Sequence, residues 1–296
     1  METTTRPDGA AVNVDPPSAE VERAVRLALD EDLGPVGDLT GALIDEAVVA
    51  SADIVTREDG VLAGEACAVV AFRFVDLALQ VEFHLHDGDR VAGGDVIATV
   101  TGSMRSIVAA ERTALNFLCH LSGIATATRT LVDAVHAVNE HVAVLDTRKT
   151  TPGLRALEKA AVRAGGGTNH RSSLSDAILL KDNHLGVMSI TDAVREAASR
   201  YPSTRIEVEC DTEGQADEAI AAGATAVLLD NMDPDLVAEC VARIRVARPE
   251  TFVEASGGIT VATAPAFAAA GVDAVSSGAL THSVRILDLG LDLHEG

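Results

Sequence analysis

From about residue 141 onward, short apolar runs alternate with amphipathic stretches. Six of the runs have the length, about four to eight residues, and the continuous apolar character of strands that are buried on both faces. The stretches between them carry apolar residues at helical spacing. This alternation predicts a parallel sheet whose strands are joined by helices. The predicted strands are residues 141–146, 177–181, 205–210, 225–230, 251–255 and 273–277.

Each predicted strand ends in polar or glycine-bearing residues. Such an ending at every strand favours a (β/α) barrel, in which the active site lies at the carboxyl ends of the strands. A doubly wound sheet would place its polar ends mainly near one switch point. Because a full eight-unit barrel usually takes about 250 residues, we expect an α/β fold with an incomplete (β/α) barrel. The endings read DTRK, KDNH, EVECD, LLDN, EASGG and SSGAL.

The first half of the chain follows a different pattern. Residues 19–34 carry apolar side chains four residues apart, which predicts an amphipathic helix. Residues 37–74 and 81–102 read as short strands separated by turns, and residues 104–139 return to helical periodicity. Residues 81–102 also have the spacing of a biotinyl or lipoyl carrier, but the chain has no lysine before Lys149 for a carrier to modify. A β-rich accessory domain is therefore expected.

The chain is strongly acidic, with 45 Asp and Glu against 23 Lys and Arg and a formal net charge of −22. This charge argues against nucleic acid or an anionic membrane as a partner, because both would repel the protein. No apolar run reaches the roughly 18 residues of a membrane span. Residues 1–18 lack the apolar core of a signal peptide and read as a disordered tail. We therefore expect a cytoplasmic location.

Cysteines and a histidine pair are interpreted as structural rather than metal-binding. No two of the four cysteines have the spacing of metal ligands, so they are expected to be buried thiols without disulfides. His84 and His86 share one strand face but have no third ligand nearby, which favours a solvated sheet face. The cysteines are Cys67, Cys119, Cys210 and Cys240.

Residues 145–184 reverse the acidic balance of the chain. Seven Lys or Arg residues lie in this stretch, and it contains all three lysines of the protein. Ammonium and guanidinium groups are standard partners of phosphate and carboxylate, so the stretch predicts an anion-binding site. Three of its cations have helical spacing and are interpreted as solvating a helix face. These three are Arg155, Lys159 and Arg163.

The same stretch predicts a βαβ unit. Its two apolar runs bracket a segment in which Pro152 occupies a first-turn position and glycines follow from Gly165, which are helix start and stop signals. A strand, a helix and a second strand with polar residues at each carboxyl end would place a site on top of the unit.

The strand ends bring together three kinds of functional group. Turns with exposed backbone amides bind phosphate, and barrels often place such turns at their last strands. Carboxylates hold Mg²⁺ or sugar hydroxyls. The set predicts a substrate with a phosphate at one end and further anionic groups at the other. The cationic groups are Arg148, Lys149, His170, Arg171 and Lys181, the carboxylates are Glu209 and Asp230, and the turns are Ser256-Gly257-Gly258 and Ser276-Ser277-Gly278.

The carboxylates also have structural interpretations. Glu207 and Glu209 lie on the same face of one strand, and because an unpaired buried carboxylate is costly, one of them must have a partner. Glu209 lies nearer the carboxyl end and is the stronger candidate. Helix capping is the structural alternative for Asp230. For Arg112, the residues alone favour a surface ion pair with Glu111.

Several long motifs resemble the quinolinate phosphoribosyltransferase family, and they cover nearly all of the chain after about residue 20. The resemblance implies an N-terminal α+β sandwich domain over residues 19–120, joined by residues 281–296, and a barrel over residues 121–280. It also implies a homodimer with sites at the subunit interface. The motifs are EDLGPVGDLT (31–40), ERTALNFLCHLSGIAT (111–126), DTRKTTPGLRALEKAAVRAGGGTNHR (146–171), LKDNHL (180–185), LLDNM (228–232), EASGGI (254–259) and SSGALTHSVRILDLGLDL (276–293).

The resemblance also implies an activity, which is transfer of phosphoribosyl from phosphoribosyl pyrophosphate to quinolinate with decarboxylation to nicotinate mononucleotide. Arg112 would reach into the neighbouring subunit's site, which reverses the interpretation drawn from the residues alone. Ser172-Ser173 departs from the family's pattern of a small or aromatic residue plus glycine, which affects the expected shape of that loop.

The resemblance assigns the remaining site residues by matching position. Lys149, Lys181, Glu209 and Asp230 would be the catalytic residues. The implied quinolinate pocket is Arg148, His170, Arg171 and Lys181, with Lys149 at its edge facing pyrophosphate; Glu209 and Asp230 would contact the ribose hydroxyls and Mg²⁺, and Ser256, Gly257, Gly258, Ser277 and Gly278 the 5′-phosphate.

A second enzyme class stays open on the residues alone. A lysine at a strand end also suits a Schiff-base aldolase or lyase, with Lys181 as the nucleophile. Borohydride trapping with a carbonyl substrate would distinguish the two classes. A binding module, either a carrier or an inactive scaffold, is the third interpretation, and a modified side chain within residues 81–102 would support it.

Overall fold

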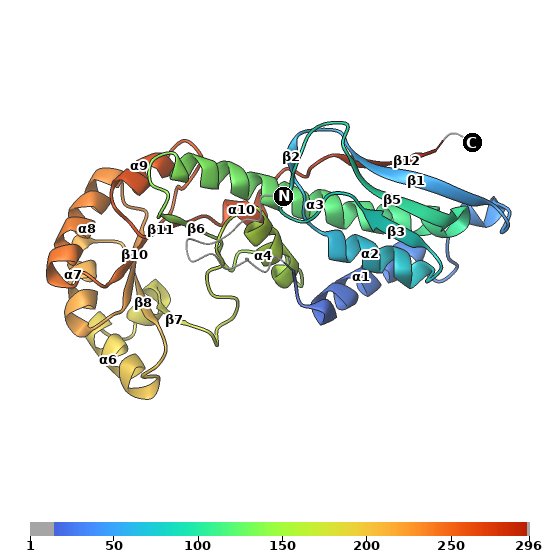
Figure 1. Ribbon diagram of the computed structural model, residues 1–296. Helices are drawn as coiled ribbons and strands as arrows, with labels where there is room; N and C mark the ends of the chain where they lie inside the picture. The colour runs from blue at the N-terminus through green and yellow to red at the C-terminus, as the bar shows by residue number, and fades with distance from the viewer. Residues whose placement is uncertain (1–14, 295–296) are drawn as a thin grey trace. The chain divides into compact units, whose positions relative to one another are not determined.

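The computed structural model describes residues 15–294 and consists of two compact units (Figure 1). Within the described residues, unit 1 comprises residues 15–129, 150–166 and 280–294, and unit 2 comprises residues 130–149 and 167–279. The predicted tail over residues 1–18 lies outside the described residues as far as residue 14. The last residues before the first helix, 15–17, have no regular secondary structure.

Unit 2 is built on a six-stranded parallel sheet with the order β6-β11-β10-β9-β8-β7. Each of the six predicted strands is present. From β7 to β11 the strands neighbour one another in chain order, with no reversal at a switch point, which is the order of a barrel opened between β6 and β7. The predicted incomplete barrel is therefore confirmed. The strands are β6 (Ala143–Leu145), β7 (Ile178–Leu180), β8 (Ile206–Cys210), β9 (Ala226–Asp230), β10 (Phe252–Ser256) and β11 (Ala274–Ser276).

Helices α6 to α9 lie along the outer side of this sheet (Figure 1). Local capping fixes where they begin. The Ser189 hydroxyl accepts a hydrogen bond from the backbone of Asp192, and Asp233 accepts one from Leu236. These caps fix the first residues of α6 and α8. The helices are α6 (Ile190–Arg200), α7 (Glu213–Ala222), α8 (Pro234–Ala247) and α9 (Ala264–Ala269), with the short α5 (Asp182–Leu185) following β7.

The predicted βαβ unit over residues 141–184 is wrong. Strands β6 and β7 lie at opposite edges of the sheet, and the helix between them, α4 (Arg155–Ala164), belongs to unit 1, where it contacts α1 (Ser18–Leu33). Helical periodicity showed that α4 forms but could not show what it packs against. Pro152 is not in the first turn, because it precedes the helix by three residues.

The predicted end of α4 is confirmed, since the helix stops before Gly165. A Cβ at Gly165 would lie 2.4 Å from the backbone oxygen of Ala125 and 2.6 Å from the Cβ of Thr128. Only glycine permits this close approach of α4 to α3. The interpretation of Lys159 as a solvated residue is wrong, because it is only 2% exposed. Arg155 and Arg163, by contrast, are partly exposed.

Unit 1 contains a four-stranded antiparallel sheet with the order β12-β1-β5-β3 and a two-stranded ribbon of β2 and β4. Three helices lie on one side of the larger sheet (Figure 1). Apolar side chains from these helices and from the sheet form one core. The elements are β1 (Val49–Thr56), β2 (Gly60–Val61), β3 (Gln80–Phe83), β4 (Arg90–Val91), β5 (Val96–Ser103), β12 (Leu289–Leu293), α2 (Glu65–Val75) and α3 (Met104–His136), besides α1; α10 (Ala279–His282) precedes β12.

Helix α2 corrects the interpretation of residues 37–74 as strands and turns. Strands β1 and β2 are present, but residues 65–75 form a helix. Its buried side chains include Cys67, Ala71 and Phe72, which recur at the four-to-five spacing of one helix face. A short, continuously apolar run does not separate a buried strand from a buried helix.

Three of the four cysteines are buried as expected, and Cys119 is half-buried. All four are free thiols. Burial raises the pKa of the Cys67 and Cys210 thiols to about 12, so both remain protonated at neutral pH. His84 and His86 are exposed, and they bond to Thr99 and Glu65 respectively.

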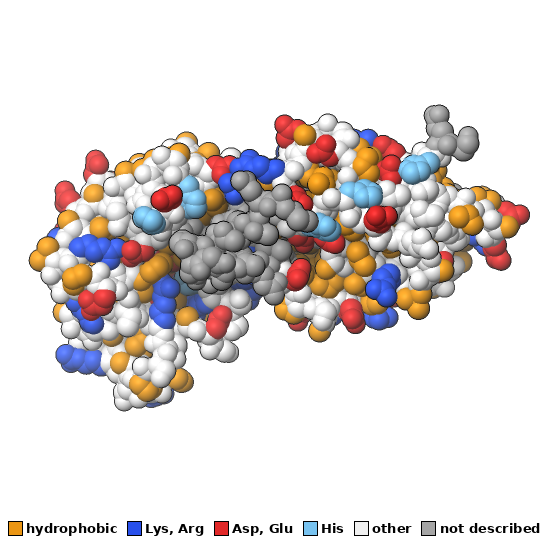
Figure 2. Space-filling view, in the orientation of Figure 1, with side chains coloured by type: hydrophobic (Ala, Val, Ile, Leu, Met, Phe, Trp, Pro, Cys, Tyr) orange, Lys and Arg blue, Asp and Glu red, His pale blue; other side chains and the backbone are white. Residues whose placement is uncertain are grey.

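On the face shown in Figure 2, the acidic side chains are not concentrated in one place. Asp and Glu are spread over both units there, with Lys and Arg among them. Within residues 15–294, no helix combines the length and the apolar character that crossing a membrane would require.

Candidate active site

The register of the parallel strands determines which side chains face the inside of the open barrel. Glu209 pairs with Leu228, Asp230 pairs with Ser256, and Ser256 pairs with Ser276. Because alternate residues of a strand point to the same face, residues two apart on these strands share the inner side. Together with the segments that follow β6 and β7, they line one cavity of about 510 Å³. The predicted residues in its lining are Arg148, Lys149, His170, Arg171, Lys181, Glu209, Asp230 and Ser256.

The remaining predicted residues do not line this cavity. Ser277 is buried, and its hydroxyl donates to the backbone oxygen of Ile259 at 3.2 Å, so its neighbour Ser276 faces the cavity instead. Alternation explains the change, because adjacent strand residues point to opposite faces. Arg112 is exposed on α3 in unit 1. Gly257, Gly258 and Gly278 follow the lining serines in the chain.

Gly257 is the glycine that the turn after β10 requires. Its backbone is left-handed, with φ of 86°, and a Cβ there would lie 2.3 Å from the side-chain oxygen of Asn231. The Asn231 side chain is itself engaged, because its amide donates to Asp230 at 2.6 Å. The turns after β9 and β10 are therefore packed against each other beside the cavity.

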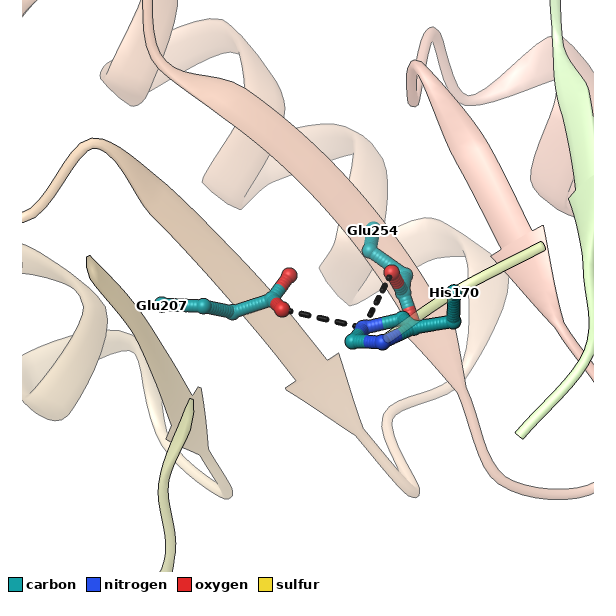
Figure 3. Close-up of side chains that lie close together, drawn as sticks. All are labelled: His170, Glu207 and Glu254. Carbon is teal, nitrogen blue, oxygen red and sulfur yellow. Dashed lines mark hydrogen bonds and ion pairs between the residues drawn. The ribbon is translucent and has the colours of Figure 1, made fainter. Parts of the chain in front are cut away.

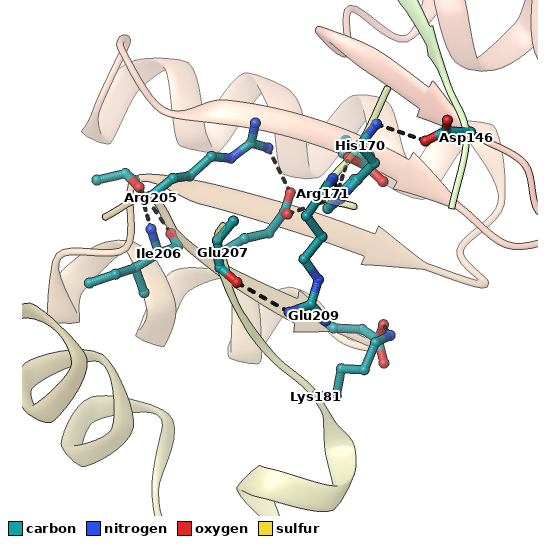
Figure 4. A network of polar contacts seen from close by, with 11 residues as sticks. Asp146, His170, Arg171, Lys181, Arg205, Ile206, Glu207 and Glu209 are labelled. Atoms are coloured by element: carbon teal, nitrogen blue, oxygen red, sulfur yellow. Dashed lines mark hydrogen bonds and ion pairs between the residues drawn. The ribbon is translucent and has the colours of Figure 1, made fainter. Parts of the chain in front are cut away.

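Lys181 and Glu209 form an ion pair within the cavity (Figure 4). Lys181 follows β7 directly, and the pairing of Leu180 with Val208 brings it level with Glu209. The side chain of Glu209 is 13% exposed and that of Lys181 is 40% exposed, so the pair is open to solvent from the lysine's side. Glu209 thus has the partner that the sequence predicted.

Two arginines, Arg148 and Arg171, also line the cavity. The Arg171 guanidinium donates to the backbone oxygen of Ala177 at 3.2 Å (Figure 4). Burial and the positive charge of Arg148 lower the pKa of Arg171 below its ordinary value. Burial is the larger cause of this lowered pKa, and repulsion between the two guanidinium groups adds to it. An anionic ligand would remove that repulsion.

Asp146, which follows β6, fixes the loop that carries His170. It is fully buried, and its two carboxylate oxygens accept hydrogen bonds from the backbone N–H of His170 at 2.8 Å and from the side chain of Asn169 at 2.6 Å. The backbone of Thr168 also donates to Val144 at 2.8 Å. These bonds hold His170 against the inner side of the sheet.

Two buried carboxylates were missed as site residues, and one of them, Glu254, lines the cavity. The Nε2 atom of His170 lies 3.0 Å from a carboxylate oxygen of Glu207 on β8 and 3.5 Å from one of Glu254 on β10 (Figure 3). The other oxygen of Glu207 accepts from Arg205 at 2.8 Å (Figure 4). The sequence contained a signal, because each of these glutamates lies two residues before an inward-facing residue, Glu209 or Ser256.

Burial and mutual contact set the charges in this group. Burial, and next the charge of Glu207, raise the pKa of Glu254 to about 7, and the nearby Ser276 hydroxyl opposes this without forming a well-oriented hydrogen bond. Burial also opposes the charge on Glu207, but contacts with His170 and Arg205 outweigh it and lower the pKa of Glu207. Burial alone would lower the pKa of His170, but its contacts with Glu207 and Glu254 outweigh burial, so its pKa is raised.

Two sets of residues are candidates for a metal ion. The ligand atoms of His170, Glu207 and Glu254 lie within 4.8 Å of one another, and within the described chain they are the one group of three with this property. The Arg205 guanidinium on Glu207 disfavours a dication there. Glu209 and Asp230 line the cavity itself and suit Mg²⁺, which commonly takes one or two carboxylates together with substrate phosphates.

Comparisons with known proteins identify the family of this chain. The family model of the quinolinate phosphoribosyl transferase N-terminal domain matches residues 38–122, and that of the C-terminal domain matches residues 124–292. A probable nicotinate-nucleotide pyrophosphorylase [carboxylating] of Bacillus subtilis is 45% identical over 267 residues, which are 89% of this chain and 90% of the relative. The nicotinate-nucleotide pyrophosphorylase [carboxylating] of Mycobacterium leprae is 42% identical over 91% of this chain and 95% of its own length.

Solved structures give the same result. The nicotinate-nucleotide pyrophosphorylase from Francisella tularensis superposes with a TM-score of 0.88 at 37% identity, over 95% of this chain and 98% of the other. The fold and the site therefore define an enzyme of the phosphoribosyltransferase class. More particularly, the chain belongs to the quinolinate phosphoribosyltransferase family.

Proposed function

We propose that the cavity of unit 2 binds quinolinate and phosphoribosyl pyrophosphate and converts them to nicotinate mononucleotide, pyrophosphate and CO₂. One observation carries this proposal. In a chain with a net charge of −22, five cationic or protonatable side chains and three carboxylates meet in one cavity of about 510 Å³. Such a cavity is suited to two anions that repel each other in water.

The reaction explains why the cavity needs these groups. The ring nitrogen of quinolinate displaces pyrophosphate at the anomeric carbon of the sugar, through a transition state with oxocarbenium character. Positive side chains stabilise the departing pyrophosphate and align the two substrates. The nitrogen becomes positively charged, which stabilises the carbanion that remains when the neighbouring carboxylate leaves as CO₂. A proton then replaces the lost carboxylate.

Each part of the cavity suits one part of the substrates. The cations Arg148, Arg171 and Lys181, together with His170, would hold the two carboxylates of quinolinate, because guanidinium and ammonium groups pair with carboxylates. Lys149, the more exposed neighbour of Arg148, would face the pyrophosphate. Glu209 and Asp230 would contact the ribose hydroxyls. Ser256 and Ser276, with the turns at Gly257, Gly258 and Gly278, would hold the 5′-phosphate.

Mg²⁺ is the cofactor that the donor set fits. Glu209 and Asp230 offer oxygen ligands on the same side of the cavity where the phosphates would lie, and neither is fully buried. When bound, Mg²⁺ would neutralise charge on the pyrophosphate. The protein's own part is to position the ribose with the same two carboxylates.

The proposal extends to the assembly and location of the enzyme. Arg112 is exposed and does not line the cavity of its own chain, which suits a residue that acts in a neighbouring subunit of a homodimer. Two sites at a two-fold interface would each receive Arg112 from the partner. The residues that contact the two substrates would then come from two chains. The enzyme would act in the cytoplasm.

The deciding experiment is incubation of the protein with quinolinate, phosphoribosyl pyrophosphate and Mg²⁺, followed by detection of nicotinate mononucleotide. Nicotinate in place of quinolinate should give no product, because it lacks the second carboxylate that the cations bind. Absence of nicotinate mononucleotide with all components present would contradict the proposal. The Schiff-base alternative would require Lys181 to leave its ion pair with Glu209. A borohydride-trapped adduct on Lys181 would revive it.

A further inference from the structure

Residues 168–171, here called the edge segment, pair with the outer side of β6 over a very short stretch. Thr168 forms a parallel bridge with Leu145 of β6, and its N–H donates to the backbone oxygen of Val144 at 2.8 Å. The segment follows a run of three glycines, residues 165–167. Because pairing is weakly specified in short or glycine-rich strands, the backbone alone does not fix the register of this segment. A side chain must fix its place along β6.

Asp146 provides that side chain. It is fully buried, and one carboxylate oxygen accepts from the backbone N–H of His170 at 2.8 Å (Figure 4). The other oxygen accepts from the side-chain amide of Asn169 at 2.6 Å. Burying a carboxylate is costly unless it is hydrogen-bonded, and hydrogen bonds to a charged acceptor are the strong ones. If the edge segment slipped along β6, this buried carboxylate would lose both of these donors.

The register of the edge segment decides where two cations of the cavity lie. Arg148 lies two residues after Asp146, and Arg171 directly follows His170; both arginines line the cavity. Their guanidinium groups repel each other, so the two arginines do not themselves hold β6 and the edge segment together. The hydrogen bonds of Asp146 hold them side by side against this repulsion.

The two segments are not anchored equally. Strand β6 pairs with β11 over three residues on its other side, so Arg148 and Lys149 follow a strand that is fixed in the sheet. The edge segment lies beyond β6, which is the last strand at that end of the sheet. Loss of the bonds to Asp146 would therefore displace His170 and Arg171 rather than Arg148 and Lys149.

We infer that Asp146 is a positioning residue for the quinolinate half of the site, because it holds His170 and Arg171 in register with Arg148. This inference rests on the proposed function, in which these three residues bind the carboxylates of quinolinate. Displacement of such groups by about 1 Å can cost about 100-fold in rate. The proposed contacts to the ribose and the 5′-phosphate come mainly from β8, β9 and β10, which pair directly with one another and do not involve Asp146.

The test removes the two hydrogen bonds and then rebuilds them with the side chains exchanged. Asp146→Ala removes both acceptors. Asn169→Asp keeps Asp146 but sets a second carboxylate against it, which repels the edge segment. In the double variant Asp146→Asn/Asn169→Asp, the exchanged amide donates to the exchanged carboxylate, and its oxygen accepts from the N–H of His170. Both bonds are then present again, with the charge on the other side.

Steady-state kinetics with each substrate varied in turn give the functional readout. In Asp146→Ala and in Asn169→Asp the KM for quinolinate should rise by about tenfold or more, because buried donors lose a charged acceptor or carboxylates face each other. The KM for phosphoribosyl pyrophosphate should stay within about twofold of the wild type. The double variant should bring the quinolinate KM back to within about threefold of the wild type, because the two residues act as a pair. An unchanged quinolinate KM in Asp146→Ala, an equal rise for both substrates, or no recovery in the double variant would overturn the inference.

Asp273→Ala is the matched control for a purely structural aspartate. Asp273 precedes β11, and its carboxylate likewise accepts from one backbone N–H, that of Val253 at 2.7 Å, and from one side chain, that of Arg245 at 2.8 Å. It does not belong to the cavity lining. Its loss should lower the Tm and leave both KM values as in the wild type. A rise in the quinolinate KM as large as that of Asp146→Ala would show that general destabilisation causes the effect, and would overturn the inference.

Hydrogen exchange followed by mass spectrometry tests the register without any substrate. Peptides that cover residues 168–171 should exchange faster in Asp146→Ala and regain protection in the double variant, because the His170 N–H loses and regains its acceptor. Unchanged exchange would overturn the positioning role, whereas absence of product from the wild type would contradict the proposed function alone. If Asp146→Ala does not fold, Asn169→Ala removes one of the two donors and should still raise the quinolinate KM more than that for phosphoribosyl pyrophosphate. Equal KM changes in Asn169→Ala would overturn the inference.

Discussion

Lys181 and Glu209 are joined in an ion pair that links two neighbouring strands at the carboxyl edge of the open barrel. The pair brings a positive and a negative group into one cavity, although each is proposed to meet a different substrate. In the absence of ligands the two side chains satisfy each other. Binding of quinolinate would draw Lys181 toward a carboxylate and leave Glu209 facing the ribose, so the pair couples the two halves of the site.

Lys181→Ala should abolish most of the turnover without unfolding the protein. Loss of one preorganised cation typically reduces kcat/KM by about 100-fold or more. The fold should persist, because the lysine side chain is 40% exposed and supports no apolar core. Steady-state kinetics with quinolinate, together with circular dichroism and Tm, measure both effects, and Arg148→Ala should behave in the same way.

Arg200→Ala is the matched control for these two substitutions. Arg200 pairs with Glu196 on the exposed surface of α6 and does not belong to the cavity lining. Its loss should leave kinetics unchanged, because exposed ion pairs contribute little. Near-normal turnover in Lys181→Ala or Arg148→Ala would show that the pocket assignment is wrong.

Removal of Mg²⁺ should stop turnover reversibly. Phosphoribosyl transfer measured in excess EDTA is expected to fall to background and to return when Mg²⁺ is added beyond the chelator. Asp230→Asn should raise the Mg²⁺ concentration needed for half-maximal rate, because one of the two candidate carboxylate ligands is lost. Asp235→Asn, an exposed position in the first turn of α8, should not change that concentration. Full activity in EDTA would exclude the proposed Mg²⁺ site.

Local patterns in the sequence were sufficient for the barrel and for most of the cavity lining. The strands of unit 2 are continuous apolar runs, and the residues that end them must meet at one edge of a parallel sheet. Arg148, Lys181, Glu209 and Asp230 could therefore be grouped from their positions in the sequence alone. The resemblance to a family added their roles. Neither the grouping of these residues nor the assignment of their roles required knowledge of which distant segments of the chain are in contact.

The features that sequence reasoning missed depend on contacts between distant segments. Glu207 and Glu254 lie on different strands and become one group only because His170 is held between them. Ser276 rather than Ser277 lines the cavity, because a one-residue difference in register reverses the face of a side chain. Residues 65–75 form a helix where strands were expected, since a short apolar run suits either element.

Subunit mixing tests whether Arg112 acts across a dimer interface. Arg112→Ala and Lys181→Ala should each be nearly inactive alone. If each site takes Lys181 from one chain and Arg112 from the other, one site of every mixed dimer is intact, and random mixing should restore about a quarter of the wild-type activity. Activity is measured after the two variants have been unfolded and refolded together.

A mixture of Lys181→Ala with Arg148→Ala is the control for this experiment. Both residues line the cavity of one chain, so every site in the mixed dimer lacks one of them and no activity should return. If Arg112→Ala mixed with Lys181→Ala also stays inactive, Arg112 does not act in the partner's site.

The buried carboxyl of Glu254 should make stability depend on pH in a defined direction. Burial raises the pKa of Glu254 from its ordinary value near 4.5 to about 7, so the folded protein holds this proton more tightly than the unfolded chain. The stabilisation is complete below about pH 4.5 and is lost as the pH rises through 7. Each pKa unit corresponds to about 1.4 kcal/mol, so the loss for this group is at most about 3.5 kcal/mol.

Urea unfolding followed by circular dichroism at pH 5, 6, 7 and 8 measures this dependence. In Glu254→Gln the free energy of unfolding should fall less between pH 6 and 8 than in the wild type, because no carboxyl is left to lose its proton. Asp87 in unit 1 also has a pKa raised by burial, to about 6, and its contribution is therefore mostly lost one pH unit lower. Asp87→Asn should flatten the curve mainly below pH 6 and leave the decline above pH 6 in place. Parallel curves for the wild type and Glu254→Gln would show that Glu254 does not hold the proton.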